Sequence, residues 1–164
     1  MKDADLLASF FALFEPLSEF MDPDDAPRCC KQTTNFANLE PLYERLPARF
    51  PRLYEKLVLS YRWEVSTIRQ GYRVLANPPG HDFSGLIEQI YRDQGLADEL
   101  LPNGLIQFAS CEYDPICFHT ESRSSRDSPI VRVDHEQILC NYRIKIVETV
   151  ASSFRDFVQK LIDV

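Results

Sequence analysis

The sequence predicts an α+β fold, a mainly antiparallel sheet with helices packed on one face. Apolar residues recur at helical spacing through much of the first hundred residues, whereas they alternate with polar residues between Leu105 and Asp134. A short amphipathic segment that follows Ser152 closes the chain. Helices first, then strands, then a final helix is the element order of an α+β protein, and it differs from alternating βαβ units.

Four segments before residue 96 carry apolar side chains at helical spacing. They cover residues 5–21, 38–46, 48–61 and 84–95. Pro16 should end or kink the first of them, because proline lacks the N–H that a helix interior needs. Asn38 and Ser84 are the expected N-caps of two others, and Gly95 is an expected helix end. The phenylalanines of the first segment are expected to dock on the sheet, with dimerisation through them as the alternative.

Alternating residues predict the strands. Gln70-Gly71 separates two short β-branched and aromatic runs, which favours a hairpin. Later apolar pairs fall two residues apart and so share one face of a strand; they are Ile106 with Phe108, Ile116 with Phe118, and Val131 with Val133. The turn 112–115 and the polar loop 121–127 are expected to connect these strands. Residues 144–147 are a candidate further strand, and Ser153-x-x-Asp156 is expected to begin the closing helix.

Composition limits the classes of function. The 164 residues have the size of one domain, 45% are hydrophobic, and the net charge is −7. An acidic chain is a poor ligand for nucleic acid, but it suits a basic protein partner. No apolar run is long enough to span a membrane. The acidic N-terminus does not resemble a secretory signal, and five cysteines without a C-x-x-C pair are typical of free thiols, so the sequence predicts a cytoplasmic protein.

Five stretches, in this order, resemble the Smi/Knr-like (SUKH) superfamily. They are Leu46-Pro-Ala-Arg-Phe-Pro-Arg-Leu-Tyr54, Leu101-Pro-Asn-Gly-Leu-Ile-Gln-Phe-Ala109, Asp114-Pro-Ile-Cys-Phe118, Pro129-Ile-Val-Arg-Val-Asp-His-Glu136 and Val150-Ala-Ser-Ser-Phe-Arg-Asp-Phe-Val158. The resemblance implies a Smi/Knr-like domain over residues 38–164, preceded by an N-terminal helix and linker over 1–37, together one compact unit. Members of this family are bacterial immunity proteins that neutralise toxins, often nucleases, and fungal regulators that act as scaffolds. It therefore implies a non-enzymatic immunity protein, with a scaffold or adaptor of the same fold as the alternative.

One set of residues is the predicted partner face. Acidic side chains fall in the turns of the predicted sheet, which we expect at one end of its strands, and a tyrosine among them could anchor an interface. The set consists of Glu112, Tyr113, Asp114, Glu121, Asp127, Asp134 and Glu136. These acids would oppose the basic cleft of a toxin domain. The chain itself is expected to be a monomer or a weak homodimer.

Chemistry at a metal or a thiol is the less favoured interpretation. The residues that could act as metal ligands or as a nucleophile with its base are Cys111, Cys117, His119, His135 and Cys140. They lack the paired spacing of a zinc site and any local signature of a cysteine nucleophile. Acid–base catalysis by Glu112 with Asp114, or by Asp134 with Glu136, would need a cleft that a sequence does not reveal. We therefore expect no cofactor, no metal and no catalysis, with a small metal-dependent or cysteine hydrolase as the third class.

Overall fold

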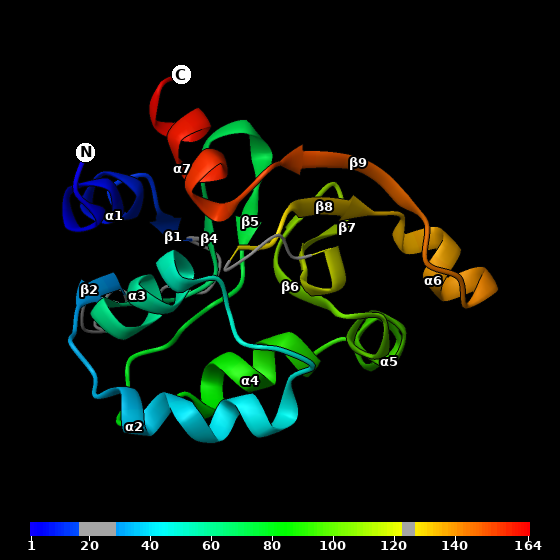
Figure 1. Ribbon diagram of the computed structural model, residues 1–164, viewed down its shortest axis with the longest axis horizontal. Coiled ribbons are helices and arrows are strands. Elements are labelled where there is room, and N and C mark those ends of the chain that lie inside the picture. The colour runs from blue at the N-terminus through cyan, green and yellow to red at the C-terminus, as the bar shows by residue number, and fades with distance from the viewer. Residues whose placement is uncertain (17–28, 123–126) are drawn as a thin grey trace.

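The computed structural model describes residues 1–16, 29–122 and 127–164, and it confirms the α+β class (Figure 1). Its helices are α1 (Asp3–Phe11), α2 (Phe36–Leu39), α3 (Arg52–Ser60), α4 (Ser84–Tyr91), α5 (Gln94–Leu100), α6 (His135–Asn141) and α7 (Phe154–Ile162). Short 3-10 helices are η2 (Glu40–Arg45), η3 (Arg69–Gly71), η4 (Leu101–Asn103) and η5 (Thr120–Ser122). None of the helices in the described ranges is long and apolar enough to cross a bilayer.

The main sheet has seven strands in the order β1-β4-β5-β6-β7-β8-β9, and every neighbouring pair is antiparallel. Its strands are β1 (Glu15–Pro16), β4 (Ser66–Thr67), β5 (Arg73–Val74), β6 (Leu105–Cys111), β7 (Asp114–His119), β8 (Ile130–Val133) and β9 (Ile146–Ala151). A second, two-stranded sheet pairs β2 (Cys29–Lys31) with β3 (Tyr61–Trp63). The predicted hairpin around Gln70-Gly71 is confirmed as the antiparallel pair β4–β5.

One face of the sheet carries the larger core, as the alternating residues predict. The Phe108 and Phe118 rings stack at 4.4 Å between their centroids, and Phe154 from α7 meets Phe108 edge-on at 5.8 Å. Tyr54 from α3 is fully buried against the same rings, and burial raises the pKa of its hydroxyl. Trp63 of β3 is also completely buried. This core joins the middle strands of the sheet to α3 and α7.

Helix α1 belongs to that same core. It ends at Phe11, earlier than the sequence predicted, and residues 17–21 of the predicted segment lie outside the described residues. Phe10 is buried and meets Phe154 edge-on at 5.8 Å. Asp3 also pairs with Lys56 of α3 and Arg155 of α7. The expected docking is therefore confirmed for Phe10 and Phe14, whereas Phe20 lies outside the described residues. Helices α1 and α7 lie side by side (Figure 1).

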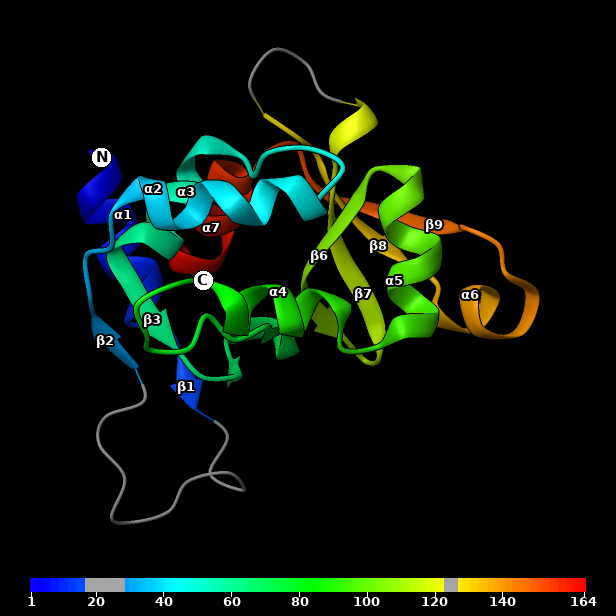
Figure 2. The same ribbon diagram turned by 90° about the horizontal axis from the view of Figure 1, so that it is seen from below.

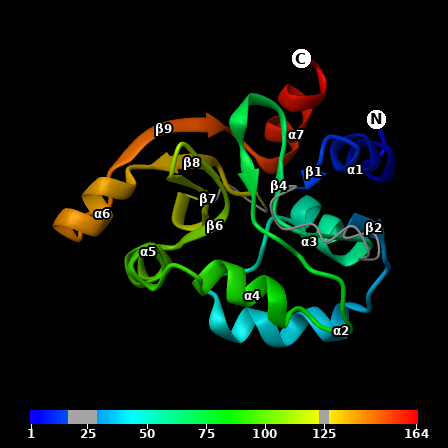
Figure 3. The same cartoon turned by 180° about the vertical axis from the view of Figure 1, so that it is seen from behind.

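Helices also reach the opposite face of the sheet, which the sequence did not predict. Leu105, Cys117 and Val131 form a smaller core there with side chains from α5 and α6. Figure 2 shows α4 and α5 following one another beside β6 and β7, and Figure 3 shows α6 projecting beyond the sheet. Cys117 is the cross-strand partner of both Gln107 and Val131, so the three side chains point to this same face. Consequently, both faces of the middle strands are partly covered.

The predicted helix caps are correct at one helix start and wrong at two. Ser84 is not the N-cap of α4 but its first residue, after Phe83, and Gly95 lies inside α5 instead of ending a helix. Ser153 begins α7 as expected, because its side chain accepts a hydrogen bond from the Asp156 N–H at 3.0 Å. Asn38 is not a cap: α2 begins earlier, and the Asn35 side chain accepts from the Ala37 N–H at 3.0 Å. The Asn38 amide instead donates to the His81 carbonyl across the fold. Two asparagines three residues apart could each begin this helix, and local sequence does not decide between them.

Candidate functional site: an acidic hairpin tip

The turn between β6 and β7 consists of only two residues, Glu112 and Tyr113. Cys111 and Asp114 pair across the strands on either side of it. Glu112 has φ of 50° and Tyr113 has φ of 75°, so both lie in the left-handed region. Tight hairpins require such values, but asparagine and glycine normally supply them. Here two residues with large side chains adopt a conformation that is unfavourable for them.

Tyr113 stands out from the surface at this turn. It is 84% exposed, the largest exposure of any aromatic side chain in the described part of the chain. Its ring lies 5.9 Å from the His135 ring, centroid to centroid, at a tilt of 44°. The tyrosine is thus held at a defined place on the molecule while most of its surface faces solvent.

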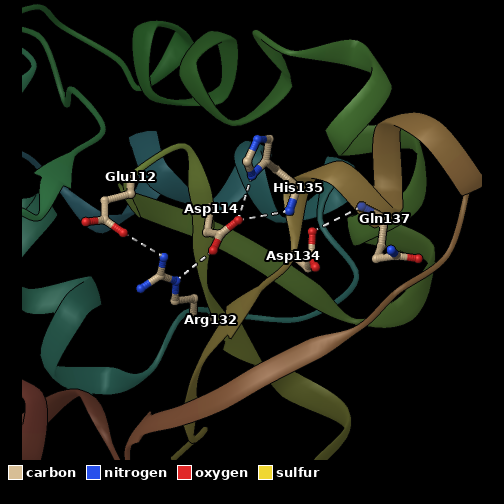
Figure 4. A network of polar contacts seen from close by, with 6 residues as sticks. All are labelled: Glu112, Asp114, Arg132, Asp134, His135 and Gln137. Atoms are coloured by element: carbon tan, nitrogen blue, oxygen red, sulfur yellow. Dashed lines mark hydrogen bonds and ion pairs between the residues drawn. The ribbon is translucent and has the colours of Figure 1, made fainter.

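An ion-pair network fixes the base of the hairpin (Figure 4). Arg132 on β8 donates from Nε to Asp114 Oδ2 at 2.7 Å and from Nη2 to Glu112 Oε2 at 3.3 Å. The other oxygen, Asp114 Oδ1, accepts from the backbone N–H of His135 at 3.1 Å and contacts its Nδ1 at 2.7 Å. Asp114 therefore connects the turn, strand β8 and helix α6 through one carboxylate.

Electrostatics keeps the Asp114 carboxylate ionised. Burial by itself would raise its pKa, but the hydrogen bonds from His135 and Arg132 outweigh burial and hold the pKa below its usual range. The hydrogen bond that Arg132 donates to Asp114 in turn raises the pKa of the Arg132 guanidinium. Because an ionised carboxylate only accepts hydrogen bonds, the proton in the contact with His135 lies on Nδ1.

Helix α6 begins at the same place. Asp134 is its N-cap, and its Oδ1 accepts from the Gln137 N–H at 3.1 Å. Glu136 lies in the first turn of this helix and is exposed. The hairpin turn and the start of α6 together form one surface, which we call the hairpin tip; its residues are Glu112, Tyr113, Asp134, His135 and Glu136.

The expectation that all the predicted site residues share one end of the sheet is wrong. Glu112, Tyr113, Asp114, Asp134 and Glu136 come together at the hairpin tip and its base. Glu121 follows the far end of β7, and Asp127 precedes β8 at that same far end. Successive connections of an antiparallel meander alternate between the two ends of the sheet. Six strand residues at ~3.3 Å each place the two groups roughly 17–20 Å apart.

The acids at the tip differ in what they can contact. The Glu112 side chain is 82% exposed, whereas that of Asp114 is only 13% exposed and is occupied by Arg132 and His135. Asp114 was predicted to touch a partner, but in the structure it supports the turn from beneath. Glu112, Glu136 and Tyr113 are the side chains that face solvent.

The metal and thiol interpretations gain little from the geometry. Asp114, Asp134 and His135 offer ligand atoms within 4.8 Å of one another, the only such cluster found in the described residues. However, a guanidinium nitrogen already lies 2.7 Å from Asp114, and a cation there would disfavour a second positive charge. Cys117 is fully buried, and burial raises the pKa of its thiol, so it stays protonated and unreactive.

Sequence analysis did not single out Arg132, and it considered His135 only for metal binding or catalysis. One signal was present: Asp134 followed three residues later by Gln137 is the pattern of a capping box. That pattern predicts a helix start at His135, directly after β8. The pairing of Arg132 with Asp114, in contrast, depends on strand register and has no local signature.

Comparisons with known proteins identify no family for this chain. No protein-family model matches this chain, and a search of curated proteins finds no significant relative.

Proposed function

We propose that this chain is a non-enzymatic protein-binding domain whose hairpin tip binds a basic partner protein. In this proposal Tyr113 is the aromatic anchor, and Glu112, Asp134 and Glu136 supply the negative charge. Asp114, Arg132 and His135 hold these contact residues in place without touching the partner themselves.

A single observation carries the proposal: a largely exposed tyrosine lies in a strained left-handed turn that a partly buried ion-pair network holds in place. Strained backbone persists only where surrounding contacts enforce it, and such strain gathers at functional sites. Rigid tyrosines contribute strongly to interfaces because few side-chain rotamers are lost on binding. The arrangement therefore suits recognition better than a turn that only connects two strands.

The charge of the tip supports a cationic partner. Glu112, Asp134 and Glu136 carry three negative charges at its surface, and Arg132 beneath them is the neighbouring positive charge. The net charge of the chain is also negative, at −7. Opposite potentials accelerate encounter and raise specificity, and their effect declines as salt screens them. Binding at this tip should consequently be salt-sensitive.

The kind of partner rests on the sequence resemblance. If the chain acts as Smi/Knr-like immunity proteins do, the partner is a toxin such as a nuclease, whose basic cleft the tip would occupy. A scaffold with several partners is the second candidate, and one observation favours it. The end of α6 and the edge strand β9 expose Leu139, Tyr142, Ile146 and Val147, apolar side chains that are not among the residues of the tip.

Co-purification tests the proposal. The tagged chain is co-expressed with the protein encoded by the adjacent reading frame, and the complex is isolated at about 50 mM and about 500 mM salt. We expect a complex at low salt that weakens at high salt and in the double variant Glu112→Gln, Glu136→Gln. Glu44→Gln, at an exposed acid on η2, is the matched control and should change nothing. A complex that tolerates both salt and the double variant would contradict a role for the tip, as would no complex at either salt.

A further inference from the structure

An open pocket of about 540 Å³ lies beside the hairpin tip, on the sheet face that α5 and α6 only partly cover. Its floor is formed by Gln107 and Ser110 of β6 and by Arg73 of β5. Arg73 and Ser110 are cross-strand partners, so their side chains point to the same face. The segment between α4 and α5 forms the wall, with Arg92 among its side chains.

Positive charge dominates this pocket in an otherwise acidic protein. Arg73 and Arg92 line it, and Asp93 is the one carboxylate in the lining. The Asp93 side chain already caps α5 by accepting from the Leu96 N–H at 3.2 Å. Within the described part of the chain, neither guanidinium has a hydrogen-bond or ion-pair partner. Two uncommitted arginines beside one occupied carboxylate leave the pocket with a positive charge.

The other lining groups suit a polar ligand. Ser110 and Gln107 present a hydroxyl and an amide from the floor, and Gln107 uses one of its donors on the Ala109 carbonyl at 3.1 Å. The Tyr113 ring closes one side and offers a flat surface for stacking. Small-molecule sites commonly enclose about 300–1,000 Å³ and combine a few polar groups with an apolar wall.

We propose that this pocket binds a small organic anion that carries a phosphate or carboxylate group. Arg73 and Arg92 hold the anionic group, because the planar guanidinium matches both oxyanions with paired hydrogen bonds. Ser110 and Gln107 bind the polar remainder of the ligand, and Tyr113 stacks against its body. This site shares Tyr113 with the proposed partner surface, but its charged residues are Arg73 and Arg92 and not the exposed acids of that surface.

Calorimetric titration of the full chain tests the pocket, with inorganic phosphate, citrate and adenosine monophosphate as probes at low salt. Phosphate and adenosine monophosphate distinguish the phosphate group alone from a phosphate with a planar body, and citrate represents carboxylates. We expect saturable binding of at least one probe, weakened about tenfold or more in the double variant Arg73→Gln, Arg92→Gln. Because neither arginine has a partner among the described residues, the variant should fold, and its melting temperature checks this.

Arg52→Gln is the matched control, because Arg52 is an exposed arginine on α3 that does not line the pocket. Binding that is lost in the double variant and retained in this control supports the pocket. Absence of binding for all three probes would overturn the proposal. Equal weakening in the control, or binding that the double variant leaves intact, would place any anion elsewhere and would overturn it as well.

Discussion

Asp114 and His135 are joined twice through one oxygen atom, Asp114 Oδ1. This oxygen accepts the backbone N–H of His135 at 3.1 Å and contacts its ring Nδ1 at 2.7 Å. The first contact fixes where helix α6 begins, and the second fixes the ring that lies beside Tyr113. A single carboxylate thus sets both parts of the hairpin tip.

Asp114→Asn should destabilise the fold at neutral pH by about 2–3 kcal/mol, because charge-assisted hydrogen bonds to Arg132 and His135 are lost. The folded state holds the pKa of Asp114 below its usual range, so its stabilisation is present above the unfolded pKa of about 3.9. It disappears as pH falls through the folded pKa, where the carboxyl becomes protonated. Urea unfolding at pH 7 and near pH 2 should show the difference between variant and wild type shrinking in acid. A difference that stays constant or grows in acid would argue against an ionised Asp114.

Tyr113→Gly should stabilise the chain while weakening partner binding. Glycine adopts φ of 75° without strain, and after its greater chain entropy is subtracted the gain should be about 0.5–1 kcal/mol. Gln70→Gly is the control, because Gln70 has φ of 63° in a turn distant from the tip. Both variants should unfold at higher urea, and only Tyr113→Gly should lose affinity. Loss of stability at Tyr113 would show that the turn is not strained.

Asp134→Ala should lower both stability and partner affinity. Removing this N-cap of α6 should lower the free energy of unfolding by about 1 kcal/mol. Ser153→Ala removes the equivalent cap of α7, which follows the end of β9 opposite to the tip, and should destabilise by a similar amount. If the two variants weaken the complex equally, Asp134→Ala acts only through stability, which would contradict a contact between Asp134 and the partner.

Phe10→Ala should destabilise the chain by about 3–5 kcal/mol, because this ring is buried among Phe14, Phe154 and Phe157. Phe11 is only half-buried, and Phe11→Ala should therefore lose about 1–2 kcal/mol. Thermal unfolding of the two variants measures the contrast. Near-equal losses would indicate that α1 does not dock through its buried face.

The elements that the sequence predicted well are those with strong local signals. Strands β6 and β7 alternate clearly around Phe108 and Phe118, and Ser153 carries the cap of α7 beside a regular apolar stripe. Helix α6 was missed because it has seven residues and buries only Ile138, which leaves too few apolar positions for a period. Strand β2 was missed because Cys29–Lys31 is short and not fully buried, which gives no alternating pattern. It is a strand because it pairs with β3, a contact distant in sequence.

The candidate site was predicted only in part, for a reason of topology. Sequence identified the acids and Tyr113, but it grouped Glu121 and Asp127 with them although that loop lies at the other end of the sheet. The alternation of connections in a meander could have separated the two groups. The role of Asp114 as a support beneath the turn depends on Arg132 and His135, which only the folded register brings together.

Hydrogen exchange of the chain with and without its partner tests the central claim most directly. If the tip is the partner face, amides of residues 111–114 and 134–137 should exchange more slowly in the complex, and those around Glu121 and Asp127 should be unchanged. Protection confined to β9, or to the loop at the far end of the sheet, with unaltered exchange at Glu112 and Tyr113, would contradict it.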